Sequence, residues 1–143
     1  MTEDELHMNT CYELAAAAQA LGNPAAGCVI VKDGEVLAAA GEASVSKADI
    51  TCHSEIEAIR EAVKKAGNDL SACTLYTTHE PCVMCSYPIR YYGVGRLVID
   101  APVHFFGGAG PQFPLLTTLN VPAHWPPPPQ ISWYPRQPPV SHC

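Results

Sequence analysis

The sequence predicts an α/β fold of three layers, α/β/α, built around a mixed sheet of about five strands. Segments with helical periodicity alternate with short β-branched runs in the order helix, strand, strand, helix, strand, helix, strand. An Asp-Gly turn joins the first two strands and makes them antiparallel. The later strands are separated by helices, so we expect parallel pairing in the later part of the sheet.

The chain is expected to begin with a helix over about residues 2–21. Apolar side chains recur there at helical spacing until Gly22, Asn23 and Pro24 stop the run. The segment "GCVIVKDGEVLAAAG", residues 27–41, then consists of two apolar runs around a Lys-Asp-Gly-Glu turn. Because Asp-Gly tolerates positive φ in a tight turn, this segment predicts two antiparallel strands.

A second helix is expected over about residues 52–66, which combine one apolar stripe with a charged outer face. The β-branched run "CTLYTT" predicts the next strand. Pro81 suits the first position of a third helix that runs towards Gly93, and Pro88 inside this helix should kink it. The run "GRLVIDA" predicts a further buried strand.

Length and charge restrict the classes of function. The chain has 143 residues, which suits one domain, and its formal net charge is −6. The eight Lys and Arg residues are scattered, so there is no basic stripe, and nucleic acid is disfavoured as a partner. The sequence shows neither a basic start followed by an apolar run nor a membrane-length apolar segment, so we expect a cytoplasmic protein without membrane contact.

The C-terminal part differs in composition from the rest. All but three of the 14 prolines lie from Pro102 onward, and four of them are consecutive from Pro126 to Pro129. We therefore expect a domain over residues 1–121 and a proline-rich tail over residues 122–143. A short "ISWY" is the only strand signal in this tail, which is expected to be extended like polyproline and either docked on the core or disordered.

Seven cysteines in a chain with no export signal are better interpreted as thiols and ligands than as disulfides. In "HEPCVMC", Cys82 and Cys85 lie three residues apart at the start of the third helix. In "CHSEIEAIR", His53 and Glu55 lie at the start of the second helix. If these helices share a direction, their N-termini bring the two cysteines and the histidine together, and the positive potential there favours thiolates.

Two thiolates and one imidazole provide three ligands and leave the fourth position of a tetrahedral zinc ion open for water, as a catalytic site requires. Glu55 lies two residues from His53 and can carry protons without being a ligand. Glu57 should point away, because two residues turn a helix by about 200°. Cys52 is interpreted as a buried thiol, and the remaining cysteines as core or tail thiols: Cys11, Cys28, Cys73 and Cys143.

The pattern His-x-Glu followed by Pro-Cys-x-x-Cys is the signature of zinc-dependent deaminases. Residues 5–110, approximately, resemble the cytidine deaminase-like superfamily, in the branch of cytosine deaminases, guanine deaminases and tRNA adenosine deaminases. The resemblance implies a Zn²⁺ cofactor held by His53, Cys82 and Cys85, with Glu55 as the catalytic residue. It implies removal of an exocyclic amine from a nucleobase or nucleoside, with guanine and cytosine types favoured, and release of ammonia. It also implies a homodimer, for which the tyrosine-rich third helix would suit the interface.

The resemblance further implies substrate contacts at Ser54 and near Glu80, and stacking on the base by the aromatic segment His104, Phe105 and Phe106. Relatives usually carry an asparagine on or just after the second strand that bonds the base or the sugar. The corresponding stretch here is "GEASVS", with Ala43 and Ser44 near that place.

Three alternatives stay open at this point. A tRNA adenosine deaminase belongs to the same class, but the acidic chain disfavours it. A structural zinc module without catalysis would be supported by a fourth protein ligand such as Cys52. A thiol-disulfide carrier would cycle Cys82 and Cys85 between two redox states and would not need His53.

Overall fold

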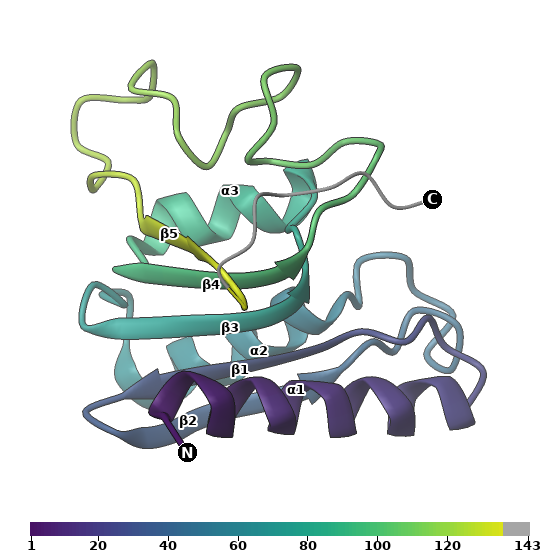
Figure 1. Ribbon diagram of the computed structural model, residues 1–143. Helices are drawn as coiled ribbons and strands as arrows, with labels where there is room; N and C mark the ends of the chain where they lie inside the picture. Colours follow the sequence, from purple (N-terminus) through teal and green to yellow (C-terminus); the bar gives the residue numbers. More distant parts are fainter. Residues whose placement is uncertain (136–143) are drawn as a thin grey trace.

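Helices cover both faces of a five-stranded sheet in the computed structural model, which describes residues 1–135 (Figure 1). The predicted three-layer α/β fold is therefore confirmed. The elements are α1 (Glu3–Ala20), β1 (Gly27–Lys32), β2 (Glu35–Gly41), α2 (Ser54–Ala66), β3 (Cys73–His79), α3 (Val83–Tyr92), β4 (Arg96–Ala101) and β5 (Gln130–Trp133).

The strands lie in the order β2-β1-β3-β4-β5. β1 pairs in antiparallel fashion with β2 and β3, whereas β3 with β4 and β4 with β5 are parallel. The predicted tight turn joins β1 to β2 through Asp33 and Gly34, both with positive φ, 52° and 78°. The sheet is thus mixed in the way the sequence predicts.

Two apolar cores lie on the two faces of the sheet, and β1 contributes to both. Cys28 and Ile30 pack towards the core that also contains buried residues of α2 and α3. Val29 and Val31 pack on the opposite core, with Met8 of α1. This alternation is the two-residue period of a strand buried on both sides.

Helix α1 lies along one face of the sheet, and α2 and α3 lie on the other (Figure 1). The hydroxyl of Thr2 caps α1 by accepting from the backbone N–H of Glu5 at 3.1 Å. The helix approaches β1 so closely at Gly27 that a Cβ atom there would collide with the Cys11 carbonyl. This contact lets α1 pack closely on its face of the sheet. The helices that carry the predicted ligands lie on the opposite face.

Helix α3 begins later than predicted. Pro81 was expected as its first residue, but the helix starts at Val83 because Cys82 has the extended backbone of an N-cap, with ψ of 174°. The helix continues past Pro88 and ends at Gly93, whose φ of 72° is the left-handed cap favoured by glycine. Tyr87 and Tyr91 are about half exposed, at 54% and 47%, and the homodimer expected through this helix stays a prediction.

After β4 the chain crosses to β5 through residues 102–129, which form no helix or named strand. β5 lies within the proline-rich stretch, at the "ISWY" signal, and pairs with β4. The boundary between a domain ending at 121 and a tail beginning at 122 stays a prediction. Residues 136–143 of that tail, with Cys143, lie outside the described residues. Over residues 1–135, no helix has the length and apolar character needed to cross a membrane.

Candidate metal centre and substrate pocket

The predicted ligands lie at the starts of α2 and α3, on the same face of the sheet (Figure 1). His53 is the N-cap of α2 and Cys82 the N-cap of α3, while Cys85 lies in the first turn of α3. Neither N-cap side chain makes a capping hydrogen bond to a backbone N–H of its own helix. The imidazole and the thiol are therefore directed to other partners, although both residues stand where capping side chains normally satisfy the free N–H groups.

The ligand atoms lie at distances that suit one tetrahedral ion. His53 Nδ1 is 3.7 Å from Cys82 Sγ and 3.4 Å from Cys85 Sγ, and the two sulfur atoms are 3.8 Å apart. Around zinc, bonds of about 2.3 Å to sulfur and about 2.0 Å to nitrogen place the ligand atoms about 3.8 Å (S to S) and about 3.5 Å (S to N) apart. Both cysteines are free thiols, and with His53 they form a group that could hold a metal ion.

The charges of this group favour metal binding. The thiol pKa of Cys82 is lowered to about 4 by hydrogen bonding with Cys85 and with His53. The pKa of Cys85 is raised by its contact with Cys82 and by burial, and the pKa of His53 is raised mainly by Cys82. In the metal-free protein the negative charge is therefore favoured on Cys82, and a bound cation would replace the thiol proton of Cys85.

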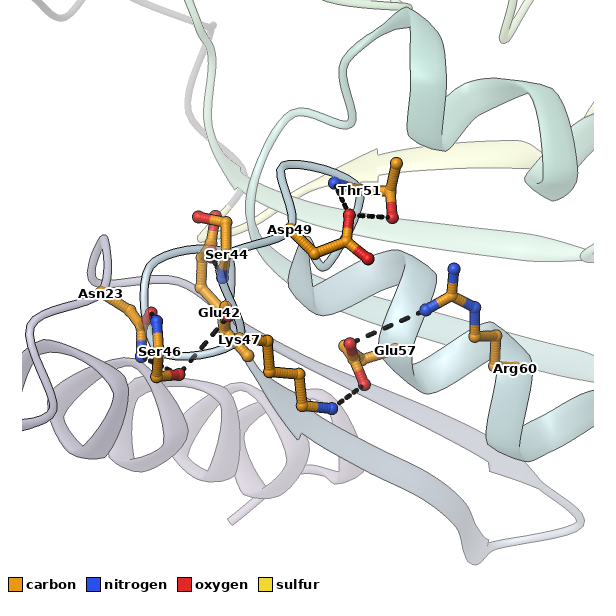
Figure 2. Close-up of polar contacts among 10 residues, drawn as sticks. Asn23, Glu42, Ser44, Ser46, Lys47, Asp49, Thr51, Glu57 and Arg60 are labelled. Atoms are coloured by element: carbon orange, nitrogen blue, oxygen red, sulfur yellow. Dashed lines mark hydrogen bonds and ion pairs between the residues drawn. The ribbon is translucent and has the colours of Figure 1, made fainter.

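Glu55 lies beside this group and is 6% exposed. Its Oε1 accepts from the hydroxyl of Ser54 at 2.6 Å and from the hydroxyl of Thr77 on β3 at 3.2 Å. Glu57 points elsewhere, as the helical geometry predicts, and pairs with Lys47 at 3.0 Å. The structure thus places Glu55 at the candidate metal centre and directs Glu57, whose side chain is 17% exposed, away from it towards Lys47 (Figure 2).

A cavity of about 360 Å³ opens beside the metal group. Its walls come from the segment before β1, the ends of β2 and β3, the starts of α2 and α3, and the loop after β4. The lining residues are Pro24, Ala25, Ala26, Glu42, His53, Ser54, Glu55, His79, Glu80, Cys82, Val103 and Phe105.

The residues predicted to contact substrate fall into two groups. Ser54 and Phe105 line the cavity, and Phe105 is 80% exposed at its edge. His104 and Phe106 are not among the lining residues; Phe106 instead packs on Phe113 with ring centroids 5.5 Å apart. Of the predicted aromatic segment, the structure therefore places only Phe105 against the cavity.

Glu80 also lines the cavity, but its carboxylate has a structural task. Oε1 accepts from the backbone N–H of Val103 at 3.3 Å, and Oε2 from that of Ala109 at 3.0 Å. Gly107 packs so closely on this carboxylate that a Cβ would collide with it. Glu80 thus ties the loop after β4 to the end of β3, which places one wall of the cavity.

Glu42 is the charged lining residue that sequence reasoning missed, along with the uncharged Pro24, Ala25, Ala26 and Val103. The prediction looked near Ala43 and Ser44, but neither lines the cavity, and Glu42, the first residue after β2, does. The available signal was an acidic residue that directly follows a strand of the hairpin. That signal is weak, because the path of the loop decides which residue after a strand turns towards the cavity.

Cys52 does not join the metal group. It is 3% exposed, and within residues 1–135 the group of possible ligands consists of one histidine and two cysteines. Cys11, Cys28 and Cys73 are likewise buried and free. The arrangement therefore has three protein ligands, which suits a site with an open position better than a closed structural site.

Comparison with known proteins agrees with this geometry. Residues 1–101 match the family model described as the cytidine and deoxycytidylate deaminase zinc-binding region. A tRNA-specific adenosine deaminase of Haemophilus influenzae is 38% identical over 112 residues, which span 77% of this chain and 65% of the relative. The match thus covers slightly less than two thirds of that relative.

Two solved structures are also similar. One, from a study of A-to-I editing by tRNA:A34 deaminases, superposes with a TM-score of 0.79 at 27% identity and covers 90% of this chain and 91% of its own. The other is guanine deaminase from Bacillus subtilis, with a TM-score of 0.62 at 35% identity, covering 68% of this chain and 63% of its own. The first likeness extends beyond residue 101 and so includes part of the crossover to β5.

Proposed function

Because the chain belongs to the family defined by the cytidine and deoxycytidylate deaminase zinc-binding region, we propose that it is a zinc-dependent hydrolytic deaminase. It removes an exocyclic amine from a heteroaromatic base and releases ammonia. The observation that carries this proposal is the set of distances among His53 Nδ1, Cys82 Sγ and Cys85 Sγ, which fit a tetrahedral ion with one open position. The buried carboxylate of Glu55 beside them supplies the proton carrier that such a reaction needs.

Zinc held by the histidine and the two cysteines supplies Lewis-acid activation of a water molecule. Glu55 takes one proton from that water and delivers it to the ring nitrogen, then takes the proton of the hydroxyl added to the ring carbon and delivers it to the departing amine. The water oxygen bonds to the ring carbon, the bond from this carbon to the amine breaks, and the nitrogen leaves as ammonia. Ser54 and Thr77 hold Oε1 of Glu55, so the carboxylate keeps one orientation during both transfers.

The favoured substrate is a nucleobase or nucleoside of guanine or cytosine type. A cavity of about 360 Å³ lies in the range typical of small-molecule sites. Phe105 at its edge offers an aromatic face to a flat base. The likeness to guanine deaminase adds support for a free base.

A tRNA adenosine deaminase is the second candidate. The sequence analysis disfavoured nucleic acid as a partner, and that expectation conflicts with the name of the Haemophilus influenzae relative and with the tRNA:A34 deaminase structure. The net charge of −6 still speaks against a phosphate-binding groove. A structural zinc module loses support because Cys52 lies outside the ligand group. A thiol-disulfide carrier loses support because its two cysteines would not need His53 between them.

The proposal is tested by ammonia release from the zinc-loaded chain. The panel contains free bases, nucleosides, related amino-heterocycles and an anticodon stem-loop RNA with an adenosine at the wobble position. Glu55→Ala is the control, with zinc content and thermal unfolding measured in parallel. Release from one class of compound that is lost in Glu55→Ala supports the deaminase and identifies its substrate class. Silence across the panel, with zinc bound and the fold intact, would overturn the proposal.

A further inference from the structure

Cys82, a candidate metal ligand, is held by backbone hydrogen bonds on both sides. The Pro81 carbonyl before it accepts from the backbone N–H of Gly108 at 2.8 Å. The backbone N–H of Val83 after it donates to the Phe106 carbonyl, also at 2.8 Å. The two peptide groups that flank Cys82 are therefore fixed by a segment that is distant in the sequence and follows β4.

These bonds fix the position from which the thiol of Cys82 leaves the backbone. Gly107 lies opposite Cys82 in an isolated antiparallel bridge, and residues 106–108 are called the bridge segment from here on. The peptide group before a residue turns with φ and the group after it with ψ, which are −70° and 174° at Cys82. With both groups held, Sγ lies 3.7 Å from His53 Nδ1 and 3.8 Å from Cys85 Sγ. The bridge segment thus contributes to the spacing of the candidate ligands.

The bridge segment also satisfies a free donor at the start of α3. Val83 is the first residue of this helix, and its N–H is one of the groups that a helix start leaves without an intrahelical partner. The Phe106 carbonyl accepts from it. Cys82 is the N-cap, but its thiol makes no capping hydrogen bond. A carbonyl from outside the helix therefore supports a helix start whose N-cap side chain is directed towards the other candidate ligands.

Phe106 adopts a backbone conformation that its residue type disfavours. Its φ is 60°, in the left-handed region that favours glycine and that bulky residues rarely adopt. Burial of the side chain does not explain this conformation, because Phe106 is 57% exposed, with its ring against Phe113. Strained backbone persists where surrounding contacts hold it, and the carbonyl of Phe106 is held by the residue that follows a candidate metal ligand.

The bridge segment is also joined to the edge of the cavity. Phe105, which lines the cavity, directly precedes Phe106. On either side of this stretch, the backbone N–H groups of Val103 and Ala109 donate to the carboxylate of Glu80. The metal ligand at the start of α3 and the aromatic edge of the cavity therefore belong to one hydrogen-bonded unit.

We propose that Phe106 is a positioning residue for the metal ligand Cys82, and that it acts through its left-handed backbone and not through its ring. A residue that resists positive φ at this position turns the carbonyl away from Val83. Both peptide groups of Cys82 then lose their support, and zinc binds more weakly. The inference rests on the zinc site of the proposed deaminase, but its test measures metal binding and needs no turnover.

The experiment compares Phe106→Val with Phe106→Asn in the full chain. Both variants remove the ring and its contact with Phe113, but a β-branched valine opposes positive φ whereas asparagine tolerates it. Phe106→Ala and Phe106→Gly form a second matched pair, which keeps the test valid if the valine variant is unstable. Asp33→Val is the control for strain elsewhere, because Asp33 has a φ of 52° in the turn from β1 to β2.

Three quantities are measured for each variant. The dissociation constant of zinc is obtained by competition with a chromophoric chelator. The visible absorption spectrum of the cobalt-substituted protein reports the geometry of the metal ligands. The Tm of the metal-free protein reports the stability of the fold without the metal. The cobalt spectrum separates a change at the metal ligands from a general loss of stability.

We expect Phe106→Val to bind zinc about 10- to 100-fold more weakly than the wild type, the range for the loss of a contact that orients a metal ligand. Its cobalt spectrum should change as well. Phe106→Asn should retain the wild-type spectrum and bind zinc within about threefold of the wild type, because its backbone can keep the bridge. Asp33→Val should lower the Tm of the metal-free protein without weakening zinc binding.

Equal zinc affinities within both matched pairs would overturn the inference. An equal loss of zinc affinity in Phe106→Val and Asp33→Val would also overturn it, because general destabilisation would then be the cause. If the wild type binds zinc but turns over no compound, the deaminase proposal fails, while a difference between Phe106→Val and Phe106→Asn still supports the role of Phe106. A wild-type chain that binds no zinc would overturn both.

Discussion

Thr77, fully buried in the middle layer, holds the carboxylate of Glu55 in the helical layer: its hydroxyl lies 3.2 Å from Glu55 Oε1. The bond joins β3 to α2 at the point where the proposed proton carrier meets the cavity. The Ser54 hydroxyl donates to the same oxygen, and neither hydroxyl uses Oε2. The Thr77 hydroxyl also lies 3.1 Å from the His79 carbonyl, a second acceptor for its proton. The orientation of Glu55 therefore depends on Ser54 together with a strand residue that does not line the cavity.

Replacing this hydroxyl should slow the reaction without removing the metal. In Thr77→Val the shape is kept but the donor to Glu55 is lost, and we expect kcat to fall about tenfold, equivalent to about 1.4 kcal/mol. KM and zinc content should change little. Thr77→Ser should recover most of the rate, and Thr74→Val on the same strand serves as control. A wild-type kcat in Thr77→Val would show that Ser54 alone orients the carboxylate.

Metal removal should destabilise the fold. A ligand that binds only the native state at about 1000 times its dissociation constant adds about 4 kcal/mol, which for a domain of this size is about 10 °C in Tm. We therefore expect chelation to lower Tm by about this amount and added zinc to restore it. Cys85→Ser should lose both the zinc and the shift, whereas His79→Ala, which changes a lining residue outside the ligand group, should retain them. Equal Tm values with and without zinc would contradict this prediction.

The metal-free protein should have one unusually reactive thiol. The pKa of Cys82 is lowered to about 4, so its thiolate persists as the pH falls from 8 to 6 and is lost only near pH 4. Alkylation by iodoacetamide, located by peptide mass spectrometry, should therefore label Cys82 first and at a rate nearly constant between pH 8 and pH 6. An ordinary thiol slows about 100-fold over this range. Zinc should protect Cys82, and a rate that falls like that of an ordinary thiol would contradict the lowered pKa.

Arg90 should stabilise the crossover between β4 and β5. This fully buried residue of α3 donates through Nη1 to the carbonyls of Leu115 and Thr118, each at 2.8 Å. Its Nε and Nη2 have no hydrogen-bond partner among the described residues, and burial lowers its pKa. Arg90→Met removes both bonds, and we expect the free energy of unfolding to fall by about 2 kcal/mol. Arg60→Met, which changes a side chain that is 54% exposed, serves as control and should change the free energy of unfolding little. Both values are measured by urea unfolding. Equal losses of unfolding free energy in the two variants would contradict a stabilising role for Arg90.

The element order and the metal group were predictable because each depends on a local pattern. Strand alternation places Cys28 and Ile30 on one face of β1, and the turn chemistry of Asp33-Gly34 sets the hairpin. The candidate ligands follow from residue type and spacing, since helix starts on one face of a sheet meet at the same edge. The predicted start of α3 was wrong by two residues. The extended backbone of Cys82 makes it the N-cap, so the helix begins after it and not at Pro81.

The pocket walls were not predictable because they depend on contacts between distant segments. Glu42 lines the cavity where its backbone N–H donates to the Ala26 carbonyl, and Asn23 holds the loop that follows it. Glu80 was expected near substrate, yet its carboxylate is taken up by Val103 and Ala109 more than twenty residues away. No periodicity or spacing in a single sequence encodes which carboxylates remain available after such long-range bonds form.

The parallel pairing of β5 with β4 has a consequence for the order of folding. Arg96 pairs with Gln130 across residues 102–129, which contain no helix or named strand that could form locally. Closing so long a connection costs entropy before any bond of β5 forms, so β5 joins a sheet already assembled from the other four strands. The part of this crossover next to β4 also supplies the cavity wall at Val103 and Phe105. Because Glu80 ties Val103 and Ala109 to the end of β3, we expect this wall to form together with the four-stranded sheet, and β5 to close the edge of the sheet afterwards.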